Sequence, residues 1–162
     1  MEAPPAVHRD VEQVLLRYCR AIDEKDWGLF ASCFTDDCRT RYQGRAFVGL
    51  TRLTDVMRRL HDPLDASLHR LTNVEVTVEG DLAQARSYVD ALLVRTGHPA
   101  GALHQVAGRY SDELVRVDGA WLIRARVFDA VWVSERGSLP VPAPGTLEHL
   151  LQVPPSSPVE GT

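Results

Sequence analysis

The feature that most constrains the fold of this 162-residue chain is a change of hydrophobic period near its middle. Up to Asp62-Pro63, apolar residues recur every three or four positions, which is the pattern of amphipathic helices. From His69 to Val133 they mostly alternate with polar residues, which is typical of strands that bury one face. Helices followed by strands predict an α+β domain, with the helices packed on one face of a curved antiparallel sheet.

The individual elements follow from the same patterns and from the turn residues between them. The helical stripes predict a helix over 9–23, a helical corner over 27–34 and a third helix from Gly49 to about Leu60. Extended segments are predicted over 39–42, 45–48, 69–78, 82–94, 104–117 and 120–133. Asp118-Gly119 lies between two alternating runs and is a strong hairpin signal, so the last two strands are expected to be antiparallel neighbours.

The last part of the chain differs from the rest in composition. Residues 137–162 hold six of the ten prolines and one short apolar patch, Leu147 to Leu151. We therefore expect one domain over residues 1–136, followed by a proline-rich tail. The tail is either flexible or a flap over a pocket or a neighbouring subunit, and the sequence leaves both alternatives open.

Composition and motifs narrow the class of protein. The formal net charge is −4 and the acidic and basic residues are interspersed, so nucleic acid is not an expected partner. No apolar run approaches the roughly 20 residues that a membrane helix needs, and no secretory signal is apparent, so a soluble cytoplasmic protein is expected. Cys19, Cys33 and Cys38 form no CxxC pair, and no phosphate loop or metal-binding motif is present. We therefore expect neither a metal nor an organic cofactor.

Ionisable side chains in apolar surroundings are the candidates for chemistry, because an enclosed titratable group is either paired or functional. Tyr18 lies in the middle of the apolar stripe of the first helix. Asp23 follows about 140° further around that helix, and this spacing alone favours an exposed carboxylate. His69 opens the first long strand on a mixed face, so the pattern alone fits either a buried structural histidine or a base.

The strands after His69 carry further ionisable residues in apolar surroundings. Asp90 is flanked by apolar residues and needs a partner if it is buried. Arg124 and Arg126 in the last strand are natural partners, and a structural ion pair explains Asp90 and Arg126 as well as a substrate contact does. An imidazole, a phenol, carboxylates and guanidiniums on one curved sheet suit proton transfer without a cofactor.

The order of several motifs is familiar. These motifs are Tyr18-x4-Asp23-x2-Asp26-Trp27, His69-x3-Asn73, Gly108-Arg109-Tyr110 and the pair Trp121 and Arg126. They resemble the SnoaL-like branch of the nuclear transport factor 2-like superfamily, and within it proteins similar to scytalone dehydratase and bacterial bile-acid dehydratases. The resemblance covers about residues 8–134 and implies a cone-shaped fold that encloses a pocket. The same scaffold serves several activities, so it does not fix the function.

The resemblance also implies roles for particular residues. In the dehydratase-like members, the residues matching Tyr18, Asp23 and His69 line the cavity, because the first helix ends at the open cone. This implication reverses what helical spacing suggests for Asp23. His69, oriented by Asp23, would remove a proton next to a ketone, and Tyr18 would donate a hydrogen bond to the oxygen. The expected substrate-binding residues are Asp90, Asn73, Arg126, Trp27, Tyr88 and His104.

The expected function is a cofactor-independent dehydratase, isomerase or cyclase that acts on a hydrophobic polyketide- or steroid-like molecule in bacterial secondary metabolism. One alternative is an epoxide-opening cyclase or hydrolase that uses the same pocket. Another is a non-catalytic small subunit of a ring-hydroxylating oxygenase, which would not need His69 and Asp23. A homo-oligomer, dimer or trimer, is expected, with Val131-Trp132-Val133 contributing to its interface.

Overall fold

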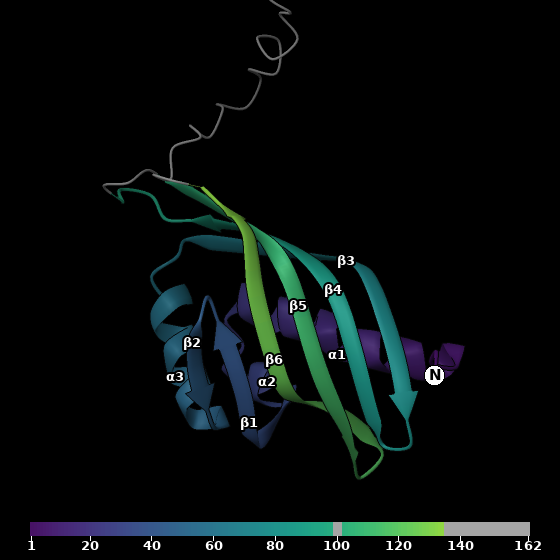
Figure 1. Ribbon diagram of the computed structural model, residues 1–162. Helices are drawn as coiled ribbons and strands as arrows, with labels where there is room; N and C mark the ends of the chain where they lie inside the picture. Colours follow the sequence, from purple (N-terminus) through teal and green to yellow (C-terminus); the bar gives the residue numbers. More distant parts are fainter. Residues whose placement is uncertain (99–101, 135–162) are drawn as a thin grey trace, which may run out of the picture.

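Helices pack against one face of a single curved sheet in the computed structural model, which describes residues 1–98 and 102–134 (Figure 1). The tail predicted over 137–162 lies outside the described residues. The helices are α1 (Pro5–Glu24), α2 (Trp27–Ala31) and α3 (Leu50–His61). The strands are β1 (Phe34–Tyr42), β2 (Arg45–Val48), β3 (Ala66–Glu79), β4 (Leu82–Val94), β5 (Leu103–Val117) and β6 (Ala120–Val133). The predicted α+β architecture is confirmed.

Helix α1 lies across the concave face of the sheet and ends close to β3 (Figure 1). Its buried stripe recurs at helical spacing and consists of Val11, Val14, Leu15, Tyr18, Cys19, Ala21 and Ile22. The helix ends at Lys25, which has a left-handed φ of 56°. The Lys25 ammonium donates to the carbonyl oxygens of Asp62 and Leu64, just before β3. This tie holds the last turn of α1, which carries Asp23, against the start of β3.

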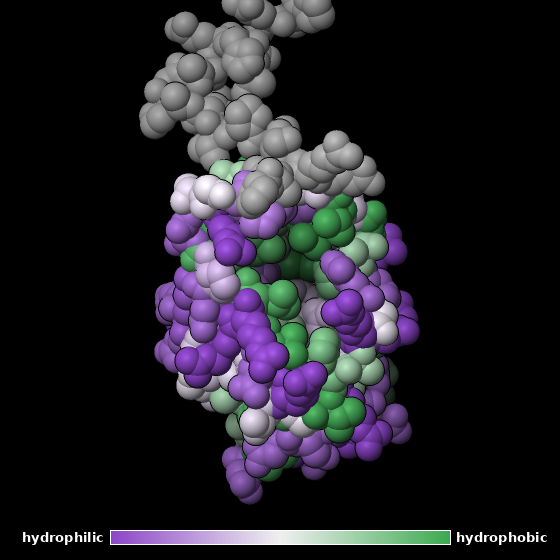
Figure 2. All heavy atoms as spheres, turned by 90° about the vertical axis from the view of Figure 1, so that its left-hand side faces the viewer, coloured by the Kyte–Doolittle hydropathy of each residue, from purple (hydrophilic) through white to green (hydrophobic). Residues whose placement is uncertain are grey.

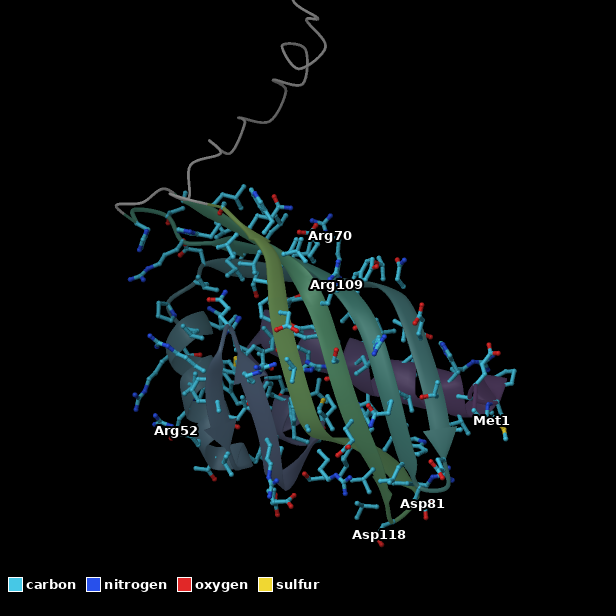
Figure 3. All side chains as sticks on the ribbon, viewed as in Figure 1. Met1, Arg52, Arg70, Asp81, Arg109 and Asp118 are labelled. Carbon is cyan, nitrogen blue, oxygen red and sulfur yellow. The ribbon has the colours of Figure 1, made fainter. Side chains whose placement is uncertain are left out.

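The strands form a six-stranded sheet, among the described residues, in the order β2-β1-β6-β5-β4-β3. Strands β3 to β6 are the predicted antiparallel meander, with turns near Asp81 and Asp118 at one end of the molecule (Figure 3). The predicted antiparallel pairing holds for β3 to β6 and for β1 with β2, whereas β1 pairs with β6 in parallel. Helices α1 and α2 precede β1, so no hairpin turn sets its direction.

The helical corner predicted over 27–34 is too long. Helix α2 ends at Ala31, and Phe34 already belongs to β1. Phe30 and Phe34 are four residues apart, which mimics a helical stripe, and their rings do pack together with centroids 5.1 Å apart. The strand is irregular at first, since its register against β6 shifts between Phe34 and Arg39. Alternating burial begins only at Cys38, so the start of the strand had no readable period.

Close approach of β5 to β6 depends on a glycine. A Cβ placed on Gly108 would lie 2.4 Å from the carbonyl oxygen of Asp129, and the register of the two strands shifts at this point. Any other residue would push the strands apart, so Gly108 supports the irregularity that bends the sheet. Among residues 1–98 and 102–134, no helix is long and apolar enough to cross a membrane.

Candidate active site

A cavity of about 700 Å³ opens between the concave face of the sheet, α3 and the β1–β2 hairpin. Figure 2 shows a hollow with hydrophobic walls and hydrophilic residues around it. Its apolar wall comes from the inward-facing side chains Phe47, Val56, Val89, Ala91, Leu93, Val106 and Phe128. In the described part of the chain, no three His, Cys, Asp or Glu side chains are grouped as a metal site.

His69 and Asp23 form a hydrogen-bonded pair at the side of this cavity. Oδ1 of Asp23 accepts from the His69 Nδ1–H at 2.7 Å and from the Ser67 hydroxyl at 2.8 Å. Its Oδ2 accepts the backbone N–H of His69 at 2.8 Å. An ionised carboxylate only accepts hydrogen bonds, so the proton of neutral His69 is on Nδ1. His69 lines the cavity, and its Nε2 makes no hydrogen bond within the described residues, so the Nε2 lone pair can act as a base.

The environment keeps Asp23 ionised. Burial raises the pKa of its carboxyl, but the hydrogen bonds from His69 and Ser67 outweigh burial and the net shift is downward. The His69 and Asp23 side chains are only 7% and 18% exposed, so little water screens their interaction. A negative charge fixed at this distance stabilises the imidazolium that forms when His69 takes up a proton.

Three phenols lie together at the inner end of the cavity. Tyr18 from α1, Tyr42 from β1 and Tyr110 from β5 all line it, and the hydroxyl oxygens of Tyr18 and Tyr42 are 3.3 Å apart. Burial raises the pKa of all three phenols, so they stay protonated and can donate hydrogen bonds. Tyr18 was predicted from the sequence, whereas Tyr42 and Tyr110 were not.

A buried ion pair supports two of these rings. Arg126 donates to both carboxylate oxygens of Asp112, at 2.6 and 2.9 Å, and both side chains are 0% exposed. The Arg126 guanidinium stacks on the rings of Tyr18 and Tyr110, 4.1 Å from each centroid. It does not line the cavity. Arg126 therefore contacts the cavity only through the tyrosines that it packs against.

A second imidazole in the cavity was not predicted from the sequence. His61, the last residue of α3, is 8% exposed, lines the cavity and lies 5.8 Å from His69 between ring centroids. Its Nδ1–H donates to the Met57 carbonyl oxygen at 2.9 Å, which leaves Nε2 as an acceptor. The available signal was position, because Leu53, Met57 and His61 follow one another at steps of four on the buried face of α3.

His61 is expected to make the folded protein less stable as the pH falls from about 7 to 5. Burial lowers the pKa of folded His61, whereas an unfolded histidine titrates near 6.5, so only the unfolded chain takes up this proton readily. The free energy of unfolding therefore falls below about pH 6.5, by at most about 1.4 kcal/mol per pH unit. Urea denaturation at several pH values measures it.

His61→Asn is the matched variant, because an amide can still donate to the Met57 carbonyl while carrying no titrating group. The variant is expected to lose less stability than the wild type over this range. The lowered pKa values of Asp23 and Asp65 produce an acid-induced loss only below about pH 4, so they do not interfere. If the free energy of unfolding changes equally with pH in the wild type and in the variant, the pH dependence does not come from His61.

Two of the predicted substrate-binding residues lie on the outer face of the sheet, away from the cavity. Asp90 accepts a hydrogen bond from the Gln105 side chain at 2.8 Å and lies 3.6 Å from Arg70. Tyr88 lies under the Arg109 guanidinium, 5.7 Å from its ring centroid. Figure 3 shows Arg70 and Arg109 on the side of the sheet opposite α1. The ion pair considered between Asp90 and Arg126 is wrong, because each has another partner.

Three further predicted residues also do not line the cavity. Asn73 lies at a bulge of β3 with a left-handed φ of 53° and borders a separate hollow on the outer face. The Trp27 indole N–H donates to the Asp62 carboxylate at 3.2 Å. His104 packs edge-on against another histidine, with ring centroids 5.2 Å apart. Of the predicted residues, the structure brings together Tyr18, Asp23 and His69, with Arg126 behind them.

A curved sheet, backed by helices and enclosing an apolar cavity with an imidazole–carboxylate pair, defines a cone-shaped α+β fold. The model of the SnoaL-like domain family matches residues 6–127, and the chain belongs to this family. The predicted resemblance to this branch of the nuclear transport factor 2-like superfamily is thereby confirmed. No curated protein matches the sequence significantly.

Several solved structures share the fold. A candidate scytalone dehydratase from Novosphingobium aromaticivorans is 21% identical with a TM-score of 0.73, over 83% of this chain and 93% of that protein. A hexachlorocyclohexane dehydrochlorinase, LinA type 2, is 18% identical with a TM-score of 0.75, over 86% and 95%. A candidate aromatic ring hydroxylase from Novosphingobium aromaticivorans is 25% identical with a TM-score of 0.74, over 85% and 97%.

Proposed function

We propose that this protein is a cofactor-independent lyase or isomerase, of dehydratase or cyclase type, which removes a proton next to a carbonyl group of a hydrophobic polyketide- or steroid-like molecule. The observation that carries the proposal is the His69 imidazole, with Nδ1–H held by Asp23 and with Nε2 available to an apolar cavity. The cavity of about 700 Å³ is within the usual size range of sites for small organic ligands.

The first chemical step follows from the positions of the proton donors and acceptors. Nε2 of His69 takes the proton from carbon, and Asp23 stabilises the resulting imidazolium. The electron pair moves onto the carbonyl oxygen, which accepts hydrogen bonds from the neutral phenols of Tyr18 and Tyr42. A positioned base is worth about 10² to 10⁴ in rate, and one oxyanion donor about 10² to 10³.

The second step returns the proton that His69 holds. In a dehydration the proton goes to the departing hydroxyl and water leaves, and in an isomerisation it goes to another carbon atom. Asp90, one of the predicted substrate-binding residues, lies on the outer face of the sheet and so does not reach the departing hydroxyl. His69 is therefore the proposed proton source, directly or through a bridging water molecule. An epoxide-opening reaction would use the same pair and stays the alternative enzyme proposal.

Solvent exchange tests the proposal without knowledge of the natural substrate. The wild type is expected to incorporate deuterium next to the carbonyl of fused-ring ketones such as 2-tetralone, saturably and above the buffer rate, as measured by NMR. Ala91 lines the cavity and is the cross-strand partner of His69, so Ala91→Phe fills the space beside the base. This variant is expected to lower kcat/KM about 10-fold or more, because the phenyl ring takes up the space that the ketone needs beside His69, and a misfit of this kind costs about 1–3 kcal/mol of binding in the transition state.

Ala46→Phe is the matched control, because Ala46 is exposed on β2 and does not line the cavity. It is expected to leave the exchange rate unchanged. If no ketone in a fused-ring series exchanges above the buffer rate with the wild type, the proposed activity is wrong. Equal rates in the two variants would place the reaction outside this cavity. A non-catalytic subunit, the third hypothesis, predicts no exchange in any of these proteins.

The proposal includes a homo-oligomer in a reducing, cytoplasmic setting. Val131, Trp132 and Val133 at the end of β6 are 64%, 48% and 44% exposed, and such an apolar run is suited to contact with a second copy. The three cysteines are buried and free, which fits a reducing compartment. Light scattering tests the oligomer, since a monomer has a mass of 18.0 kDa.

A further inference from the structure

The cavity lining has a different charge balance from the rest of the protein. The chain carries 22 acidic residues and a net charge of −4, yet among residues 1–98 and 102–134 no Asp or Glu side chain lines the cavity. Two arginines do, Arg45 and Arg52. The carboxylate that the mechanism uses, that of Asp23, lies behind His69 and is hydrogen-bonded to it. A ligand in this cavity therefore meets positive charge and no exposed negative charge from the lining.

Both arginines are on the open side of the cavity. Arg45 begins β2 and Arg52 is in the first turn of α3, and both residues are exposed. Figure 3 shows Arg52 on the same side of the molecule that Figure 2 views face-on, where the hollow opens. Within residues 1–98 and 102–134, neither arginine makes an ion pair, so both guanidinium groups are available to a ligand.

The inner end of the cavity does not suit a permanently anionic group of a ligand. Tyr18 and Tyr110 are 2% and 4% exposed and are neutral donors, and the charge of the buried Arg126 behind them is balanced by its ion pair with Asp112. An anionic group bound there before His69 has taken up a proton would lose its hydration without gaining a counter-charge, which costs several kcal/mol. The cavity thus changes along its length, from arginines at the mouth to apolar walls and neutral donors inside.

We propose that the ligand of this cavity is a hydrophobic molecule with one anionic group, such as a carboxylate, which Arg45 and Arg52 bind at the mouth. Its uncharged ring system then occupies the inner end beside His69. A planar guanidinium suits a carboxylate because it can donate two parallel hydrogen bonds. The anion therefore fixes the direction of entry, and the part of the molecule farthest from it is the part that reacts. The proposal rests on the proposed function in taking this cavity as the substrate site.

Two fluorescent probes of nearly equal shape test it. 1-Anilinonaphthalene-8-sulfonate carries one anionic group, and N-phenyl-1-naphthylamine is the same molecule without it. The readout is the ratio of the two dissociation constants, measured by fluorescence at low ionic strength because salt screens exposed charges. The wild type is expected to bind the anionic probe more tightly. The double variant Arg45→Gln/Arg52→Gln is expected to reduce this preference about 10-fold, as two partly exposed charge contacts would.

Arg41→Gln/Arg59→Gln is the matched control. Arg41 and Arg59 come from β1 and α3, are exposed and do not line the cavity, and their loss changes the net charge equally. This control is expected to keep the preference of the wild type. No preference in the wild type, or an equal reduction in both double variants, would overturn the proposal. Probe binding needs no turnover, so His69→Gln should keep the preference even where deuterium exchange is lost, and the two proposals can fail separately.

Discussion

Asp23→Asn is expected to slow deuterium exchange into 2-tetralone by about 10² to 10⁴, the full effect of a positioned base. In the wild type, the carboxylate accepts the His69 backbone N–H on one oxygen and the Nδ1–H on the other. An asparagine side chain has only one acceptor oxygen, and its amide nitrogen can only donate. If that oxygen keeps the backbone N–H, the amide nitrogen faces Nδ1 of His69.

The tautomer of His69 then reverses. Nδ1 accepts from the new amide, the proton moves to Nε2, and the lone pair that faces the cavity is lost. His69→Gln, which removes the base outright, is expected to give a loss of the same size. Nitrogen-15 NMR of labelled histidine reports which ring nitrogen is protonated, so tautomer and rate are measured on the same sample.

Asp10→Asn and His104→Gln are the matched controls. Asp10 is exposed on the same helix as Asp23, and His104 does not line the cavity. Both are expected to retain the wild-type rate. An Asp23→Asn protein that is folded, has the reversed tautomer and exchanges at the wild-type rate would eliminate His69 as the base.

Arg126→Met is expected to lower the free energy of unfolding by about 3–5 kcal/mol. The substitution removes the partner of Asp112, whose side chain is 0% exposed, and leaves a carboxylate without counter-charge in the core. It also removes the cation that stacks on Tyr18 and Tyr110. A domain of this size is stable by only about 5–15 kcal/mol, so the loss is a large fraction of the total.

The double variant Arg126→Met/Asp112→Leu separates the charge effect from packing. It removes both charges, so most of the loss is expected to be recovered, because apolar groups of similar volume replace buried ion pairs at little net cost. Urea denaturation of the two single variants and the double variant completes a mutant cycle. If the double variant is as unstable as the sum of the two single variants, the ion pair is not the cause of the loss.

The sequence predicts the elements well where a period is clean. The bounds of β2, β4 and β6 agree with the structure, and the other elements differ by a few residues at their ends. The start of β1 was mistaken for helix because Phe30 and Phe34 match a helical spacing. The direction of β1 could not be predicted either, since no tight turn joins it to β6 and only tertiary packing of α1 and α2 places it there.

Alternation shows which residues of a strand share a face, but it does not show which face is inside. Tyr88 and Asp90 do share a face of β4, and that face is the outer one, whereas Val89 and Ala91 face the cavity. The apolar residues on both sides of Asp90 made the two assignments indistinguishable. Asp23 shows the reverse case, because helical spacing predicts an outward-facing side chain. In the structure, the hydrogen bonds of Lys25 hold the end of α1 close to β3, and the donors of Ser67 and His69 bind the Asp23 carboxylate.

The sequence does not single out His61 as a site residue either. His61 directly precedes Asp62-Pro63, where the helical pattern ends, although in the structure it continues the buried stripe of α3. Tyr42 and Tyr110 come from two different strands, so only the tertiary structure brings their hydroxyl groups beside Tyr18. The roles proposed for Tyr18, Asp23 and His69 remain predictions for the experiments above.

The parallel pairing of β1 with β6 has a consequence for synthesis of the chain. Tyr42 is in register with Phe128, and both line the cavity, so this wall joins one strand made early to another made late. Pairing between such distant segments forms slowly, because closing a long loop costs conformational entropy. A nascent chain can form α1 and the first hairpins on the ribosome, but it has no ligand site until the last strand has emerged. Ligand binding therefore reports that translation has passed β6 and that β6 has paired with β1.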